Sequence, residues 1–310
     1  RINSDMSGLS SSEIENDLRK LGIQAGDTTL VHSAMRTMGH VEGGAKTFVD
    51  TLLGMLGPSG TLVVPTFTFA HEAEDNPVVD PAADHSEMGI ITETARLYPD
   101  ARRSTAFRHS FAAIGKWSGV IAGNDAALSP FDLRSSFGVM AALNTKVIML
   151  GVTYESSTSH HFAEFVCEVP YRQVISLNAK VRQASGKVVE QPMMDYQPKS
   201  EGGSYYGTRG PDFNRLGQML EDRGVVNTAF IGNAAVRQFA MRDLLDLARL
   251  EAAQDYNIFR SPDGEPDNTT ALKFGCSIDS PELIDGAGRA HAVEWCVKDV
   301  DKLILPGADV

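Results

Sequence analysis

The first seventy residues alternate between apolar positions at helical spacing and short apolar runs. This pattern predicts a helix over about 12–21, a buried strand at 28–32, a helix over 45–56 and a second buried strand at 60–66. Each predicted strand is followed or preceded by a helix, and such β-α-β alternation is typical of a parallel sheet with helical crossovers. The N-terminal part of the chain therefore indicates an α/β fold.

The rest of the chain keeps this character around an antiparallel insertion. Two extended segments, 174–182 and 187–190, flank a short turn that contains Gly186, which predicts a hairpin. Two polar stretches without a clear period, 70–87 and 195–210, are expected to be loops. The other predicted elements are a helix at 88–97, an extended segment at 109–114, a strand at 146–152, a helix at 158–167, a helix at 213–220, a strand at 228–232 and a helix at 236–250.

These elements predict the fold class and the domain organisation. We expect a mixed sheet with a parallel β-α-β core flanked by helices, built as one α/β domain over residues 10–260. Residues 1–9 are expected to be a disordered tail or a remnant of cloning. Pro, Asp and Gly mark a linker from about Ser261, so residues 261–310 form a C-terminal extension without an assigned role.

Composition narrows the range of partners. The net charge of −12 argues against nucleic acid or an anionic membrane as the main partner, because both favour clustered Lys and Arg. The same charge suits a small cationic substrate. Three cysteines without a CxxC pair favour reduced thiols and a cytoplasmic protein, and neither a signal peptide nor a membrane-spanning run is recognisable.

The most informative segment for chemistry is the predicted helix at 158–167. Thr158, His161 and Glu164 stand three residues apart, so they share one helix face just after a buried strand. At the carboxyl edge of a sheet, a histidine with a carboxylate in register can act as a general base. The alternative is structural, with Thr158 as a helix cap and Glu164 on a solvated face.

A metal site is the other interpretation of this segment. Neither an H-E-x-x-H pattern nor its inverse occurs. Side chains of the adjacent residues His160 and His161 diverge by about 100° on a helix, so the two should not bind one ion together. We therefore expect no metal.

Other polar positions follow predicted strands. The segment from Val31 to Met35 offers backbone N–H groups that can bind an oxyanion or phosphate, or simply form a capped turn. The glycine-rich stretch 39–47 has one residue too many before Lys46 for a P-loop, so we reject nucleoside triphosphate binding. Serine-hydrolase chemistry is unsupported because no G-x-S-x-G elbow occurs, and Cys167 is interpreted as a packing residue.

A series of short motifs runs along the chain in a fixed order: Leu30-Val31-His32-Ser33, Met38-Gly39, Gly43-Gly44, Leu56 to Thr68, Met88-Gly89, His109 to Ala113, Ser129-Pro130-Phe131, Leu150-Gly151-Val152, Thr158 with His161, Ala163 and Glu164, and Val169-Pro170-Tyr171-Arg172. In their order and spacing, these motifs resemble the aminoglycoside 3-N-acetyltransferase family, also called the antibiotic N-acetyltransferase family. The resemblance runs from about residue 13 to 258.

The resemblance implies acetyl transfer from acetyl-CoA to an amine, on a fold unlike the common GNAT acetyltransferase fold and without a metal. The amine is typically the 3-amine of a 2-deoxystreptamine aminoglycoside, so the activity would confer antibiotic resistance. His161 would be the general base in a direct transfer within a ternary complex, oriented by Glu164 or, as a lesser candidate, Glu155. The residues that would line the acetyl-CoA channel and stabilise the thioester oxyanion are His32, Ser33, Ala34, Met35, Arg36, Thr66, His109, Ser110 and Phe111.

Departures from the family pattern concern the acceptor. Ala106-Phe107 replaces a His-Pro pair, and Asp132 replaces a glycine. Acidic residues of the 70–87 loop would attract the ammonium groups of the acceptor, and the substrate-binding candidates are Glu72, Asp80, Glu87 and Glu164. Two alternatives stay open: a non-aminoglycoside biosynthetic or toxic amine as acceptor, or a non-catalytic protein that binds a cationic ligand. A monomer or homodimer is expected.

Overall fold

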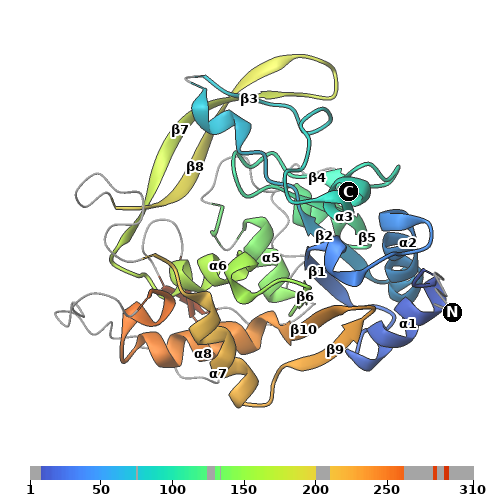
Figure 1. Ribbon diagram of the computed structural model, residues 1–310. Coiled ribbons are helices and arrows are strands. Elements are labelled where there is room, and N and C mark those ends of the chain that lie inside the picture. Colours follow the sequence, from blue (N-terminus) through green and yellow to red (C-terminus); the bar gives the residue numbers. More distant parts are fainter. Residues whose placement is uncertain are drawn as a thin grey trace, which may run out of the picture.

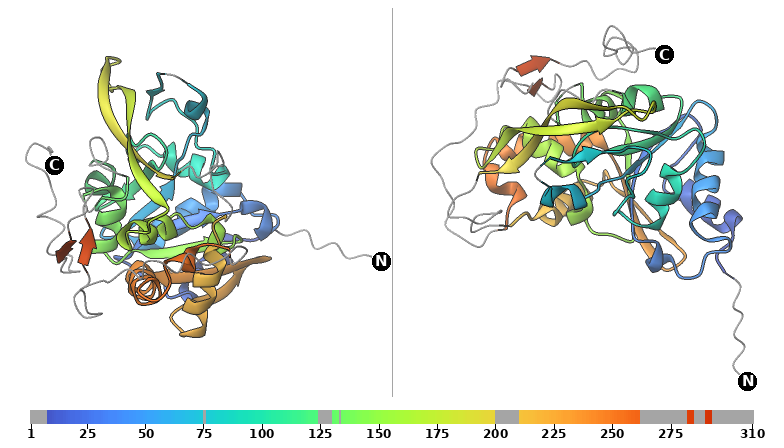
Figure 2. Two further views of the ribbon diagram at one scale, coloured as in Figure 1. Left: turned by 90° about the vertical axis from the view of Figure 1, so that its left-hand side faces the viewer. Right: turned by 90° about the horizontal axis from the view of Figure 1, so that it is seen from above.

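The structure is a computed structural model that describes residues 8–74, 76–123, 130–132, 134–199, 210–261, 282–284 and 290–292. Within this part of the chain, a central sheet lies between two helical layers, and a long hairpin rises above the sheet (Figures 1 and 2).

Seven strands of the described chain form the central sheet, in the order β4-β5-β2-β1-β6-β10-β9. β1 pairs in parallel with both β2 and β6, whereas the outer pairs are antiparallel. The predicted mixed sheet with a parallel core is therefore confirmed. The strands are β1 (Thr28–Ser33), β2 (Thr61–Pro65), β4 (Arg102–Arg103), β5 (Phe111–Gly115), β6 (Lys146–Leu150), β9 (Asn227–Ile231) and β10 (Ala234–Ala240).

Alternate residues of each strand enter two different hydrophobic clusters. In β1, Leu30 packs with the cluster of α5 to α8, and Val31 packs with the cluster of α1 to α3. Both clusters are fully buried, so the sheet is covered on both faces. The helices are α1 (Ser11–Lys20), α2 (Gly44–Leu56), α3 (Ile90–Arg96), α4 (Ser118–Ala122), α5 (Ser136–Ala142), α6 (Ser159–Val166), α7 (Phe213–Asp222) and α8 (Met241–Ala252).

The predicted hairpin is real and longer than its sequence signal. β7 (Arg172–Arg182) and β8 (Val188–Pro198) pair along their whole length, and we call them the hairpin arm. The short strand β3 (Val78–Val79), from the acidic loop, adds to β7 in parallel. The prediction of a loop from 195 is wrong for 195–198, which belong to β8, and residues 200–209 lie outside the described part.

The prediction of one helix over 236–250 is also wrong. The chain turns at Gly232-Asn233 into β10, which pairs with β6, and only then begins α8 at Met241. Val236 and Phe239 fit helical spacing with the leucines of α8, so the periodicity ran across the boundary. Sheet pairing decides the local structure here.

Short elements complete the description: the 3-10 turns η1 (Met35–Met38), η2 (Ala70–Ala73), η3 (Tyr154–Ser156) and η4 (Tyr256–Phe259), and the strands β11 (Glu282–Ile284) and β12 (Ala290–Ala292). Of the expected N-terminal tail, Leu9 forms a bridge with Val41, and residues 1–7 lie outside the described part. Most of the expected extension 261–310 lies outside it too.

Candidate active site

The candidate site lies at the carboxyl ends of β1 and β6. Within the sheet, β2 lies beside β1 on one side and β6 lies beside it on the other. Such a reversal of strand order leaves a crevice at the carboxyl edge in open α/β sheets. Gly151, just after β6, has φ +64°, and a Cβ there would lie 1.8 Å from Thr37 Oγ1. Glycine thus lets the backbone after β6 approach η1 closely.

His161 and Glu164 form a hydrogen-bonded pair on α6. His161 Nδ1 lies 2.6 Å from Glu164 Oε2, and 21% of the histidine side chain is exposed against 1% of the glutamate. An ionised carboxylate only accepts hydrogen bonds, so Nδ1 carries the proton and Nε2 has a free lone pair. The shared helix face predicted from the spacing is confirmed for His161 and Glu164. The structural alternative is wrong, because Glu164 is buried and Thr158 makes no capping bond.

Two residues beyond α6 complete the surroundings of Glu164. The hydroxyl of Tyr171 donates to Oε1 at 2.9 Å, and Arg172 Nε lies 2.8 Å from Oε2. The chain reaches them through a reversal at Glu168, which has φ +48°. There Val169 N–H donates to Glu164 C=O and Glu168 N–H donates to Phe165 C=O, which is a Schellman turn.

Burial and charge set the protonation of the pair. Burial lowers the pKa of His161, and the positive charge of Arg172 lowers it further against the opposing effect of Glu164. Burial would raise the pKa of Glu164, but Arg172, His161 and Tyr171 outweigh it and leave the pKa below its ordinary value. Glu164 is therefore ionised and His161 neutral near pH 7, which is the state a general base requires.

His160, the residue before His161 on α6, packs among aromatic side chains of the core instead of joining this pair. It is fully buried, stacks on Phe213 at 5.1 Å and lies 5.9 Å from the ring of Tyr154. Burial lowers its pKa to about 3. His160 is thus a neutral core residue. Among the described residues, no group of three or more His, Cys, Asp or Glu is arranged to hold a metal ion.

The segment before β5 approaches His161 from the opposite wall. The ring of His109 lies 6.3 Å from that of His161 and 4.9 Å from that of Phe131. Burial, with the charges of neighbouring groups, holds the pKa of His109 well below its ordinary value. Its Nδ1 lies 4.0 Å from Oδ1 of the buried Asp195 on β8. Two histidines and two buried carboxylates are thus gathered at one place.

The other expected acetyl-CoA residues separate into three groups. Ser33, Ala34 and Met35 are partly exposed and Arg36 is exposed, where the end of β1 leads into η1. Thr66 and Ser110 are buried with their hydroxyl oxygens 3.1 Å apart. His32 is buried, with its pKa lowered to about 4 by burial, and Phe111 lies in the core. The structure therefore leaves the segment after β1 as the accessible part of the set.

The carboxylates expected to bind substrate are already engaged. Glu72 pairs with Arg108 at 3.1 Å, and Asp80 pairs with Arg182 at 3.0 Å. Glu87 accepts the backbone N–H groups of Phe69 and Ala70. These contacts hold the acidic loop against itself, the hairpin arm and the segment before β5.

Glu155 lies apart from the pair on α6. Its carboxylate accepts the backbone N–H of Asn214 at 3.1 Å, at the start of α7. Burial raises its pKa. In this structure Glu164, and not Glu155, contacts His161.

Several residues of the site had no role assigned from the sequence. Tyr171 and Arg172 stand in a matched motif, but nothing in their spacing reveals that they return to Glu164. Asp195 and Tyr196 come from the far strand of the hairpin arm, and Arg108 precedes His109. Only the Arg108-His109 neighbourhood offered a local signal.

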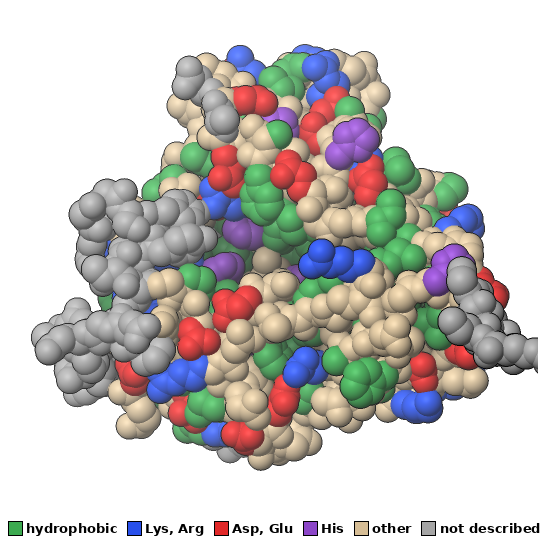
Figure 3. Space-filling view, in the orientation of Figure 1, with side chains coloured by type: hydrophobic (Ala, Val, Ile, Leu, Met, Phe, Trp, Pro, Cys, Tyr) green, Lys and Arg blue, Asp and Glu red, His purple; other side chains and the backbone are tan. Residues whose placement is uncertain are grey.

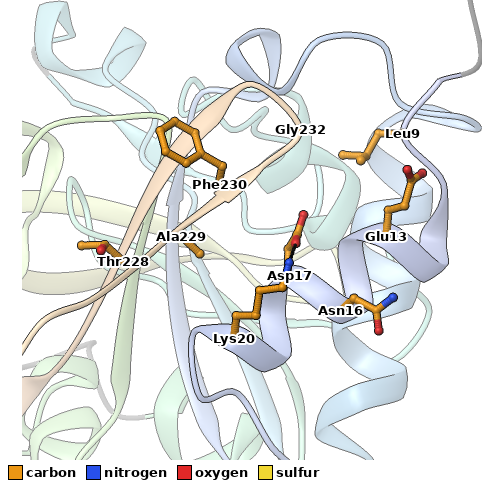
Figure 4. A pocket seen from close by; sticks show the side chains of 9 residues that line it. All are labelled: Leu9, Glu13, Asn16, Asp17, Lys20, Thr228, Ala229, Phe230 and Gly232. Atoms are coloured by element: carbon orange, nitrogen blue, oxygen red, sulfur yellow. Dashed lines mark hydrogen bonds and ion pairs between the residues drawn. The ribbon is translucent and has the colours of Figure 1, made fainter. Parts of the chain in front are cut away.

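The surface agrees with this placement. Figure 3 shows histidine side chains in a hollow at the centre of one face, beneath the hairpin arm. Another groove, of about 640 Å³, lies between α1 and β9 (Figure 4) and contains none of the predicted site residues. It is lined by Leu9, Glu13, Asn16, Asp17, Lys20, Thr228, Ala229, Phe230 and Gly232.

The fold and the site are those of an acetyltransferase. The chain is a member of the aminoglycoside 3-N-acetyltransferase family, whose sequence model matches residues 30–251. The resemblance stated from the sequence is thereby confirmed. No described helix combines the length and apolar character needed to cross a bilayer.

Individual relatives agree with the family. Aminoglycoside N(3)-acetyltransferase IV of Salmonella sp is 26% identical over 251 residues, covering 81% of this chain and 90% of the relative. The aminoglycoside N(3')-acetyltransferase-like protein YokD of Bacillus subtilis is 28% identical, covering 76% and 89%. Among solved structures, sisomicin-bound AAC-VIa superposes with a TM-score of 0.67 at 25% identity, covering 79% of this chain and 99% of the other.

Proposed function

We propose that this protein transfers the acetyl group of acetyl-CoA to an amine of an aminoglycoside, typically the 3-amine, with His161 as general base. The observation that carries the proposal is the 2.6 Å contact of His161 Nδ1 with buried Glu164, which leaves Nε2 unprotonated on a partly exposed side chain. Membership of the family supports the reaction class.

The chemistry follows from the protonation of the acceptor. An ammonium group has no lone pair, so it cannot attack until a base removes a proton. Acetyl-CoA supplies a thioester, an acetyl group already activated for attack. Nε2 of His161 takes one proton from the ammonium group, and the nitrogen then forms a bond to the carbonyl carbon. The C–S bond breaks, the nitrogen releases its second proton to solvent, and the leaving thiolate takes up the proton held by His161. General-base catalysis of this kind contributes about 10²–10⁴-fold.

Direct transfer fits the neighbours of His161. Its hydrogen-bond partner is Glu164, a carboxylate that orients the ring. Cys167, directly after α6, is fully buried in the core rather than placed as a nucleophile. We assign the orienting role to Glu164, and the partly exposed segment Ser33–Arg36 to the acetyl-CoA channel. Direct transfer requires both substrates to bind together in a ternary complex.

The contacts of the acidic loop keep a second acceptor class open. The carboxylates of Glu72, Asp80 and Glu87 are held by arginines or backbone N–H groups. The charges of Glu72 and Asp80 are therefore largely balanced, whereas Glu87 is engaged but keeps its charge. Glu72 and Asp80 act on an acceptor chiefly through the field of the whole acidic protein. A smaller biosynthetic or toxic amine meets the requirements of His161 equally well.

The test is a thiol-release assay with acetyl-CoA across aminoglycosides with and without a free 3-amine, plus small diamines. We expect release with 3-amine compounds and a loss of about 10²–10⁴-fold in kcat for His161→Ala. His40→Ala, at an exposed histidine before α2, is the matched control and should retain wild-type rates. Release that survives His161→Ala would disprove the base assignment. Release with small amines alone would transfer the proposal to the second acceptor class.

A further inference from the structure

Glu164 is shared between the base and a buried cation. Oε2 lies 2.6 Å from His161 Nδ1 and 2.8 Å from Arg172 Nε, and Oε1 accepts the hydroxyl of Tyr171. Only 7% of the Arg172 side chain is exposed. The guanidinium lies over the ring of Tyr196, 5.4 Å from its centroid. Arg172 thus has a defined place beside the carboxylate.

This sharing resolves a conflict in the design of a general base. A buried carboxylate alone would orient the imidazole but also stabilise its protonated form, which cannot accept a proton. A cation on the same oxygen offsets the negative charge and leaves the hydrogen bond to Nδ1 in place. The ring then stays oriented without being protonated.

We propose that Arg172 is a positioning residue that keeps His161 neutral by offsetting the negative charge of the ionised Glu164, and that Tyr171 fixes the orientation of the carboxylate. This inference rests on the proposed function of His161 and names two further residues for the same reaction. Tyr171 suits its part because burial and the neighbouring Glu164 raise its pKa well above the ordinary value. It therefore remains a hydrogen-bond donor.

Other charged and titratable groups face His161 from several elements. Arg108 acts in the same direction as Arg172, but Glu72 and Asp195 engage it at 3.1 and 3.6 Å. His109 and His160 are neutral because burial lowers the pKa of each. Arg172 is the cation that touches the partner of His161. Among the described residues, these groups are Glu164 and His160 on α6, Tyr171 and Arg172 near the start of the hairpin arm, Asp195 and Tyr196 on β8, and Arg108 and His109 before β5.

The experiment measures the protonation of His161 directly. Protein labelled with ¹³C-histidine is titrated by NMR, with His161 assigned from the spectrum of His161→Gln. In Arg172→Gln the pKa of His161 should rise by about 1–2 units, because the offsetting charge is gone. In Glu164→Gln it should fall, because Arg172 then acts alone. The two variants move the same signal in opposite directions, so one of them suffices if the other fails to fold.

Kinetics provide the second measurement. The acidic limb of the pH profile of kcat/KM should move to higher pH in Arg172→Gln. In Arg172→Lys, which restores the charge, it should return toward the wild-type position. Tyr171→Phe should lower kcat by about ten- to a hundred-fold through misplacement of the base, with the limb nearly unmoved. Arg182→Gln, the same change at the other end of β7, is the control and should leave the limb in place.

An unmoved His161 signal in Arg172→Gln, or an upward shift in Glu164→Gln, overturns the inference. The NMR titration needs no turnover. If the wild type transfers no acetyl group but the signals shift as expected, the proposed function fails while the electrostatic arrangement stands.

Discussion

Replacing Glu164 by Gln tests the buried charge cluster most severely. The side chains are nearly equal in shape, so the change removes one negative charge and little volume. It leaves Arg172, 7% exposed and 2.8 Å from Oε2, without a counter-charge. Breaking a buried ion pair by removing one partner costs about 3–5 kcal/mol.

This loss in the free energy of unfolding is large enough to measure by thermal unfolding. For a domain of this size class, about 1 kcal/mol moves Tm by about 2–4 °C, so Glu164→Gln should melt about 6–20 °C below the wild type. The rate should fall by about 10²–10⁴-fold as well, since His161 loses its orienting carboxylate. Thermal unfolding followed by circular dichroism and the thiol-release assay check the two effects separately.

Controls separate charge from shape. Glu168→Gln, at an exposed glutamate four residues on, should change Tm by less than about 2 °C. The double variant Glu164→Gln, Arg172→Met removes the stranded cation and should recover much of the lost stability, but not the activity. A single variant as stable as the wild type, or a double variant no better than the single one, would refute the reasoning.

Three further predictions concern stability and acetyl-CoA binding. Because burial lowers the pKa of His160 from 6.5 to about 3, the unfolded chain binds a proton in this range that the folded chain does not. The free energy of unfolding should therefore fall by about 1.4 kcal/mol per pH unit below pH 6.5. Urea unfolding of His160→Gln at pH 7, 6 and 5 should show a weaker dependence of stability on pH. Gly151→Ala forces a Cβ to within 1.8 Å of Thr37 and should raise KM for acetyl-CoA more than KM for the amine. Gly186→Ala, at a glycine with φ +82° and open space around it, is the control and should change only stability. The same KM for acetyl-CoA in both variants would contradict this prediction. Glu168→Gly should stabilise the protein by about 0.5–1 kcal/mol in urea because glycine accepts φ +48° without strain, and a loss of stability would show that the turn is unstrained.

The fold was predictable where one periodicity filled one element. β1, α2 and β2 follow their apolar spacing closely, because alternate residues of the strands face the two clusters and the buried residues of α2 all face one. The boundary between β10 and α8 was not predictable, because buried Gln238 interrupts the apolar alternation of the strand. Gln238 pairs across the sheet with Ile148. Gly232-Asn233 was the missed signal, a two-residue turn between apolar runs that is typical of hairpins.

The site shows the same division between local and distant information. The pair of His161 and Glu164 was predictable from three-residue spacing on a helix. The approach of Asp195 to His109 was not, because it depends on how the hairpin arm docks against the segment before β5. Engagement of the acidic loop by Arg108 and Arg182 was equally hidden, since sequence shows charges but not their partners.

The Schellman turn at Glu168 has a consequence for chain entropy. It brings Arg172 back to Glu164 by closing a loop of about eight residues, whereas His109 meets Asp195 only by closing one of about eighty-six. Since the cost of loop closure grows as (3/2)RT ln n, the shorter closure is cheaper by about 2 kcal/mol. The base, its carboxylate and the two residues that hold the carboxylate therefore form a local unit, which can assemble before the distant walls of the site arrive.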